Sequence, residues 1–320
     1  MPYAVTVAVI CGIMFVLAGL DYSPVMLVVA AVLLTVVVFA LHKLSVKKYG
    51  QEKTPGKYHK RGFNMSQSLW PEGKKSAAMF TFDLDGDIIW QNMSSDEPNT
   101  EKLIRARSIG QYGPNRCVDM ILDLLDKYQV KATFFAPGYV AEHNPDVIRR
   151  IDEAGHEIGN HGYTHERFVE KTVEEQLEIL KKTQKIIKDI TGKEPKGFRT
   201  PSGDWHVRTP YLLNELGFLY SSSMRGDDIP YYTVLDGKET DLVEIPSKWE
   251  LDDYVAQAYS VYPAEPAGLD RISCYRNVQD NDLREFRGYY DMGLCIAFLM
   301  HPQISGAPGR NLVLEEVLKE

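Results

Sequence analysis

Residues 80–87, Phe-Thr-Phe-Asp-Leu-Asp-Gly-Asp (FTFDLDGD), end a short apolar run with three aspartates. The two-residue period of a β-strand would turn Asp83, Asp85 and Asp87 toward the same side. Carboxylates that lie close together repel one another, and burying them is costly unless a cation or a hydrogen-bond donor compensates. The stretch therefore predicts the end of a buried strand and, beside it, a positively charged partner.

Downstream of this stretch, short apolar runs alternate with helical patterns. The runs typical of strands are SAAMFTF (76–82), KATFFAP (131–137), HEIGNH (156–161), KGFRTP (196–201), GFLYSSS (217–223), LVEIP (242–246) and LCIAFLMHP (294–302). The clearest helix covers residues 171–192, where Thr172 and Glu175 form a capping box and Gly192 ends the helix. Strand followed by helix, repeated along the chain, predicts an α/β fold with parallel strands, a (β/α) barrel of seven or eight strands. The polar residues 88–114 are expected to form a loop over its top.

The first 41 residues differ from the rest of the chain. Residues 2–20 and 24–41 carry no charged side chain, and each run is long enough to cross a bilayer as a helix. A signal peptide is the alternative for the first run. Lys and Arg are concentrated in residues 42–61, and positive side chains stay on the cytoplasmic side. We therefore expect a transmembrane helical hairpin at 1–41, a basic juxtamembrane linker at 42–69 and a cytoplasmic domain at 70–320, hence a multi-pass protein of the cell membrane.

Charge and cysteine usage exclude two classes of protein. Residues 1–61 carry seven basic and two acidic side chains, a net charge of +5, so the remaining residues carry −13 of the chain's total of −8. Such an acidic domain is unsuited to contacts with nucleic-acid phosphates. The four cysteines, Cys11, Cys117, Cys274 and Cys295, form no close pair, which indicates free thiols and not a thiolate zinc site.

Polar residues follow several of the predicted strands. They are Asp83 and Asp85, His161 and His165 in an H-x-x-x-H pattern, Arg199, and His301. Each motif alone has a plain alternative, such as surface histidines, a turn or an ion pair. The carboxyl ends of parallel strands meet at one face of a barrel, and two histidines with one carboxylate make a metal site that leaves positions open. The H-x-x-x-H spacing places both imidazoles on one side of a helical turn.

The order of these motifs resembles the polysaccharide deacetylase (NodB-homology) superfamily. Its motifs, D-x-D after a first strand, H-x-x-x-H, R-x-P and a late histidine, match residues 81–85, 161–165, 199–201 and 301. The segments WPEGKKSAAMFTFDLDGD, GHEIGNHGYTHE, EIPSKWELDDY and MHPQISGAPGR most resemble a branch that contains peptidoglycan-deacetylase-like proteins and relatives that open cyclic imides or allantoin. The resemblance covers residues 70–320 and implies a distorted, NodB-like barrel.

The resemblance also implies roles for individual residues. Asp85, His161 and His165 match metal ligands, Asp83 the general base, Arg199 the residue that holds this base, and His301 the general acid. Trp249, Leu251 and Asp252 fall in the substrate-pocket segment. Ser221 stands where relatives commonly carry an aspartate, and if that acid orders the site, activity would be lowered.

The function implied is that of a metal-dependent hydrolase of a non-peptide carbon–nitrogen bond, with an N-acetylated sugar or glycan as substrate. Zn²⁺ is the expected metal, and Mn, Fe, Co or Ni also suits two histidines and a carboxylate. Two alternatives stay open, namely ring opening of a cyclic imide or allantoin-type amide, and a catalytically silent, membrane-tethered carbohydrate-binding module. The expected partners are the saccharide or small amide, membrane lipid at the N-terminal hairpin, and a second copy of the chain.

Overall fold

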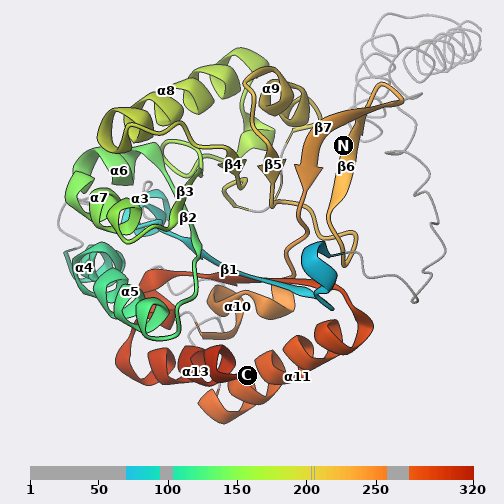
Figure 1. The fold of residues 1–320 in the computed structure, drawn as a ribbon. Coiled ribbons are helices and arrows are strands. Elements are labelled where there is room, and N and C mark those ends of the chain that lie inside the picture. Colours follow the sequence, from blue (N-terminus) through green and yellow to red (C-terminus); the bar gives the residue numbers. More distant parts are fainter. Residues whose placement is uncertain (1–69, 94–103, 203, 205, 258–273) are drawn as a thin grey trace, which may run out of the picture. The chain divides into compact units, whose positions relative to one another are not determined.

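The computed structural model describes residues 70–320 except for 94–103, 203, 205 and 258–273. This part contains an eight-stranded sheet with the order β6-β7-β5-β4-β3-β2-β1-β8 (Figure 1). The strands are β1 (Ala77–Asp83), β2 (Thr133–Ala136), β3 (Glu157–Asn160), β4 (Gly197–Phe198), β5 (Tyr220–Ser221), β6 (Tyr231–Leu235), β7 (Lys238–Glu244) and β8 (Cys295–Met300).

The sheet is a curled half-barrel. All neighbouring strands are parallel except β6 and β7, which form an antiparallel hairpin. The sheet order ends at β6 and β8, so within the described residues these strands are not paired with each other. The predicted α/β fold and strand number are therefore confirmed, whereas the predicted barrel is open on one side.

The helices lie around the outside of the curled sheet (Figure 1). They are α3 (Ile88–Met93), α4 (Ile104–Tyr112), α5 (Val118–Lys127), α6 (Gly138–His143), α7 (Pro145–Glu153), α8 (Val173–Thr191), α9 (Thr209–Glu215), α10 (Asp253–Gln257), α11 (Tyr275–Met292), α12 (Pro302–Ser305) and α13 (Pro308–Lys319). The predicted capping box of α8 is confirmed: Glu175 N–H donates to Thr172 Oγ1, and Thr172 N–H donates to Glu175 Oε2. Gly192 ends the helix in the left-handed region, with φ of 75°.

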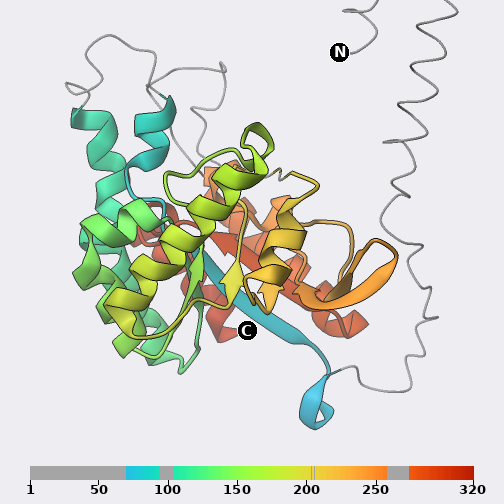
Figure 2. The same ribbon diagram turned by 90° about the horizontal axis from the view of Figure 1, so that it is seen from above.

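The described residues between β1 and α5 do not form the predicted loop. Helices α3 and α4 occupy its described parts and lie side by side (Figure 2). Asp87 explains this difference, because its Oδ2 accepts hydrogen bonds from Arg107 Nε (3.1 Å) and Gln111 Nε2 (3.2 Å), one turn apart on α4. A Cβ atom at Gly110 would lie 2.2 Å from Gly86 O, so only glycine lets α4 approach the turn after β1 this closely.

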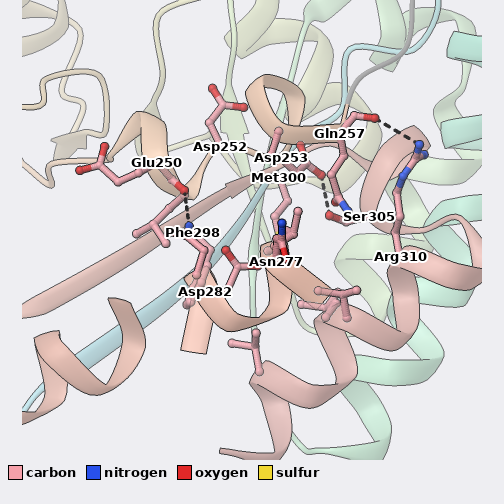
Figure 3. Close-up of a pocket in the computed structure, with 17 residues that line it drawn as sticks. Glu250, Asp252, Asp253, Gln257, Asn277, Asp282, Phe298, Met300, Ser305 and Arg310 are labelled. Atoms are coloured by element: carbon pink, nitrogen blue, oxygen red, sulfur yellow. Dashed lines mark hydrogen bonds between the residues drawn. The ribbon is translucent and has the colours of Figure 1, made fainter. Parts of the chain in front are cut away.

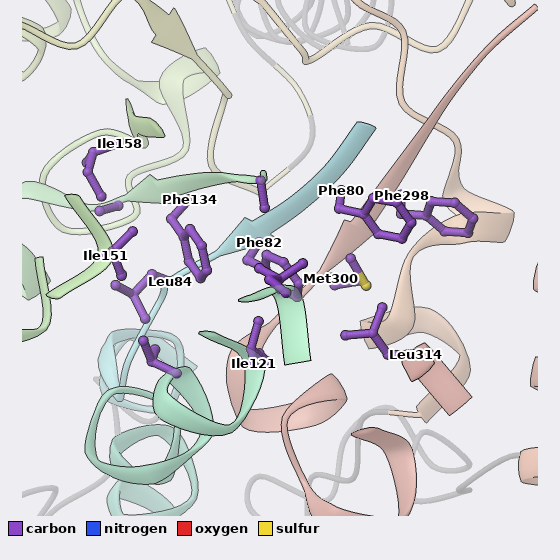
Figure 4. Close-up of a cluster of buried hydrophobic side chains, with 14 of the residues drawn as sticks. Phe80, Phe82, Leu84, Ile121, Phe134, Ile151, Ile158, Phe298, Met300 and Leu314 are labelled. Carbon is purple, nitrogen blue, oxygen red and sulfur yellow. The ribbon is translucent and has the colours of Figure 1, made fainter. Parts of the chain in front are cut away.

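The alternation of side chains along β1 separates the core from the inside of the curled sheet. Phe82 stacks on Phe134 with ring centroids 4.9 Å apart, and Phe80 stacks on Phe298 at 5.2 Å (Figure 4). Thr81 and Asp83 point to the opposite side, as the strand period requires. The hydrophobic cluster fixes β1 and so determines where its carboxyl end lies.

The predicted localisation, a multi-pass protein of the cell membrane with a cytoplasmic domain, needs correction. Within the described residues, no helix combines the length and apolar character needed to cross a bilayer. The predicted hairpin at residues 1–41 and the linker at 42–69 lie outside the described residues.

Replacing Phe82 by Ala is expected to destabilise the fold strongly. Phe82 is fully buried, and the substitution removes its ring from the core together with the stacking on Phe134. The free energy of unfolding should therefore fall by about 3–5 kcal/mol. Denaturant unfolding measures this. Leu219→Ala is the control, because Leu219 is 59% exposed and should change stability by roughly 0.5 kcal/mol or less. A Phe82→Ala effect as small as that of the control would contradict the assigned core.

Candidate active site

Predicted site residues from four strands meet at the carboxyl end of the sheet. Asp85 follows β1, and its Oδ1 lies 3.4 Å from His161 Nε2 and 3.7 Å from His165 Nε2, in the segment after β3. Its Oδ2 lies 3.5 Å from His301 Nε2, after β8. Asp83, the last residue of β1, lies 2.8 Å from Arg199 Nη1, after β4. The structure thus brings together all six predicted metal and catalytic residues.

The segment that carries the two histidines is a tight loop and not the predicted helical turn. Gly162 and His165 have φ of 68° and 55°, which a right-handed helix does not allow. The Glu166 carboxylate accepts the backbone N–H groups of residues 163 and 164, both at 2.9 Å, and thereby closes the loop. The two imidazoles do lie close together, as predicted. The cause is the loop closed by Glu166 and the left-handed backbone at Gly162 and His165, and not a helical turn.

Hydrogen bonding fixes the orientation of His161. The carbonyl of Arg199 can only accept, so the contact of 2.8 Å assigns the ring proton to His161 Nδ1 and leaves a lone pair on Nε2. Burial lowers the pKa of His161, and burial also lowers the pKa of His165 to about 4. Both imidazoles are therefore neutral near pH 7, the form that binds metal ions.

Asp85 is fully buried, and neither of its oxygens has a hydrogen-bond partner among the residues that the structure describes. Burial raises the pKa of Asp85 above its usual value, although the charges of His161 and His301 oppose the rise. A buried carboxylate without donors is unfavourable unless a cation compensates. With His161 and His165, it offers two nitrogen ligands and one oxygen ligand whose atoms lie within 4.8 Å of one another, so the residues present fit a divalent metal ion.

A second cluster, formed by Asp252, Asp253 and His301, has similar spacing but fits a metal less well. Asp253 Oδ1 already accepts a hydrogen bond from His301 Nδ1 at 2.7 Å. Its Oδ2 accepts from the His301 backbone N–H at 2.9 Å and from Ser305 Oγ at 2.5 Å. The donors around Asp253 thus satisfy it without a cation, whereas Asp85 has no donor in the described part of the chain.

Arg199 is buried and holds Asp83 in its ionised form. Burial alone raises the pKa of Asp83, but the charge and hydrogen bond of Arg199, together with the charges of His161 and His301, outweigh burial and hold the pKa below its usual value. The guanidinium also lies 4.3 Å from the centroid of the Phe135 ring and donates to Thr81 Oγ1 at 2.8 Å. Its position is therefore set by strands β1 and β2 as well as by Asp83.

Asp253 is the functional residue that the sequence did not single out. Burial alone lowers the pKa of His301, but the hydrogen bond and the negative charge of Asp253 raise it to about 10. The sequence placed the neighbouring Asp252 in the substrate-pocket segment and gave Asp253 no role. Asp252 forms an isolated parallel bridge to Leu299, whereas Asp253 is the first residue of α10. The contact between Asp253 and His301 joins residues 48 positions apart, so no local pattern in the sequence indicates it.

The predicted substrate residues do not share one environment. Leu251 and Asp252 line a cavity of about 220 Å³ between the 249–257 segment, α11, α13 and β8 (Figure 3). Burial raises the pKa of Asp252 to about 6. Trp249 does not line this cavity and is 68% exposed. The site roles of all three residues stay predictions.

Comparisons with known proteins agree with this fold and with the family that the sequence resembles. A family model described as polysaccharide deacetylase matches residues 111–221. The crystal structure of a putative polysaccharide deacetylase from Mycobacterium smegmatis is similar with a TM-score of 0.72 and 34% identity, over 78% of this chain and 85% of that protein. The peptidoglycan deacetylase of Helicobacter pylori is 28% identical over 270 residues, which cover 77% of this chain and 90% of that protein.

The crystal structure of Puue allantoinase shares the fold, with a TM-score of 0.68 and 23% identity over 83% of this chain and 90% of that protein. Fold and sequence together define a hydrolase of carbon–nitrogen bonds other than peptide bonds. The chain belongs to the polysaccharide deacetylase family. The predicted family and enzyme class are thereby confirmed.

Asp282, on α11, is expected to make stability depend on pH. Burial and the negative charge of Asp253 raise the pKa of Asp282 to about 7 (Figure 3). An unfolded aspartate titrates near 3.9, so the folded protein binds the additional proton and the free energy of unfolding falls as pH rises from about 4 to about 7. Asn does not titrate, so Asp282→Asn should gain about 4 kcal/mol over wild type at pH 8 and little at pH 4.

Urea unfolding of both proteins at the two pH values measures this difference. Asp291→Asn is the matched control, because the Asp291 side chain is 76% exposed. A stability difference between Asp282→Asn and wild type that stays constant with pH would contradict the assignment.

Proposed function

We propose that residues 70–320 form a metal-dependent deacetylase domain that hydrolyses the amide bond of an N-acetylated sugar or glycan. The observation that carries this proposal is the buried Asp85 carboxylate, which has no donor among the described residues and faces two neutral imidazoles. Similarity to a protein named peptidoglycan deacetylase supports the choice of a glycan substrate.

Asp85, His161 and His165 would hold the divalent ion. Two nitrogens and one oxygen suit Zn²⁺, and Mn, Fe, Co or Ni also fits this donor set. When bound, such an ion lowers the pKa of a water molecule and polarises a carbonyl oxygen. His161 Nδ1–H donates to the Arg199 carbonyl, which keeps Nε2 turned toward Asp85 and available as a ligand.

Asp83 is the proposed general base. Its Oδ1 is bound by Arg199, so Oδ2, which lies 3.7 Å from His161 Nε2, is the oxygen free to accept a proton from the attacking water. Arg199 favours the ionised carboxylate before the proton arrives. The same ion pair restrains the carboxylate, so that the accepting oxygen keeps its direction.

His301 is the proposed general acid. Asp253 binds Nδ1, so the proton available for transfer sits on Nε2, on the side of Asp85 away from His161 and His165. From there it can reach the leaving nitrogen when the amide bond breaks. Base and acid are thus different residues held by different partners, Arg199 and Asp253.

Acetate release tests the substrate class. We expect the metal-loaded protein to release acetate and a free amine from N-acetylated sugar oligomers, to lose this activity in a chelator and to regain it with added Zn²⁺. A panel of cyclic imides and allantoin is assayed in parallel. Ring opening without acetate release would favour the allantoinase-type alternative, and no turnover of either panel by metal-loaded protein would favour the silent binding module; each result would overturn the proposal.

Variants separate metal binding from proton transfer. Asp85→Ala should lose the bound metal, measured by elemental analysis of protein purified without added metal. His301→Ala should keep the metal but lose roughly 10²–10⁴-fold in kcat, since it removes only the proton donor. His143→Ala, an exposed histidine of α6, is the control and should change neither property. Metal content unchanged in Asp85→Ala, or a wild-type rate in His301→Ala, would contradict the assigned roles.

A further inference from the structure

Glu244 is a buried acid that the proposed chemistry does not use. It is the last residue of β7, is fully buried, and is paired in register with Ser221 at the end of β5. Burying a carboxyl group costs free energy unless donors satisfy it. Glu244 lies at the carboxyl end of the sheet, the same end as Asp85, His161 and His165. This position links its burial to the site.

The donors that satisfy Glu244 come from the turn after β5. Its Oε1 accepts the backbone N–H groups of Ser223 at 2.7 Å and Met224 at 2.8 Å. Ser223 in turn accepts the Thr200 backbone N–H on its Oγ at 3.0 Å. One carboxylate oxygen therefore fixes two consecutive peptide groups, and through Ser223 it also ties the turn to the residue after Arg199.

Ser222, which immediately precedes these two peptide groups, holds the guanidinium of Arg199. Arg199 Nε donates to the Ser222 carbonyl at 2.9 Å, and Arg199 Nη2 donates to Ser222 Oγ at 2.8 Å. The remaining nitrogen, Nη1, donates to Asp83 Oδ1 at 2.8 Å. Displacement of the Ser222 backbone would remove two of the bonds that aim Arg199 at Asp83.

We propose that Glu244 is a positioning residue of this site, which acts by binding the Ser223 and Met224 peptide groups and so holds Ser222 where it orients Arg199 on Asp83. The inference rests on the proposed function, in which Asp83 is the base. What the position requires is an acceptor oxygen and not a negative charge. Burial raises the pKa of Glu244 to about 7, and a protonated carboxyl group still has a carbonyl oxygen with which to accept both N–H groups.

Three variants test the inference through steady-state kinetics on metal-loaded protein. Glu244→Ala removes the acceptor and should lower kcat by about 10- to 100-fold with little change in KM, since a small misplacement of a catalytic group is costly and Glu244 is not proposed to touch substrate. Glu244→Gln keeps one acceptor oxygen and should restore most of the rate. Glu157→Ala is the matched control: Glu157 is the first residue of β3, at the end of the strand opposite His161. It accepts hydrogen bonds from Thr133 Oγ1 and Tyr220 Oη, and its loss should leave kcat unchanged.

A double variant shows whether the effect passes through Arg199. In an Arg199→Ala background, Glu244→Ala should lower kcat by less than about 3-fold more, because the group it positions is already absent. A further loss as large as in the wild-type background would overturn the inference, as would equal losses in Glu244→Ala and Glu244→Gln.

A crystal structure of Glu244→Gln and of Glu244→Ala tests the same inference without turnover. We expect Arg199 to remain on Asp83 in the Gln variant and to leave it in the Ala variant. Arg199 unmoved in Glu244→Ala would overturn the positioning role. If the metal-loaded wild type turns over no substrate, the proposed function fails by itself, and these structures still decide whether Glu244 positions Arg199.

Discussion

The buried Asp85 carboxylate is the constraint on which the rest of the site depends. Its two oxygens face the Nε2 atoms of His161, His165 and His301 at 3.4–3.7 Å, and none of these contacts is a hydrogen bond. A fold that keeps such a group must recover its cost elsewhere, and the half-barrel does so by packing phenylalanine rings of β1, β2 and β8 on the other face of the same sheet. Core and site are thus two faces of the same strands.

The sheet topology explains how distant motifs converge. Strands β8, β1, β2, β3 and β4 are consecutive neighbours and all parallel, so the residues after them reach one edge of the sheet. Three side chains of the site are then oriented by hydrogen bonds to neighbours. His161 binds the Arg199 carbonyl, Arg199 binds Ser222, and His301 binds Asp253.

The sequence was most informative where local rules decide the structure. The capping box at Thr172 and the apolar runs depend on neighbouring residues alone, and the strand ends indicated six residues that the structure brings together. The sequence was not sufficient where contacts between residues far apart in the chain determine the local structure. Helix α4 follows from the partners of Asp87, the loop between His161 and His165 from Glu166, and the pairing of Asp253 with His301 from a contact between residues 48 positions apart. Glu244 lies 23 residues from its register partner Ser221, and no local pattern marks it.

The contrast between Asp85 and Asp253 shows why residue type alone does not locate a metal. Both are buried aspartates beside His301, and both belong to clusters with ligand-type spacing. Asp253 has three donors, and its negative charge stabilises the protonated imidazole of His301. Asp85 has no donor among the residues that the structure covers, and it lies beside His161 and His165, whose pKa values burial lowers. The same side chain is therefore a fixed counter-ion at Asp253 and the proposed metal ligand at Asp85, and the hydrogen-bond donors around each carboxylate are the basis for this distinction.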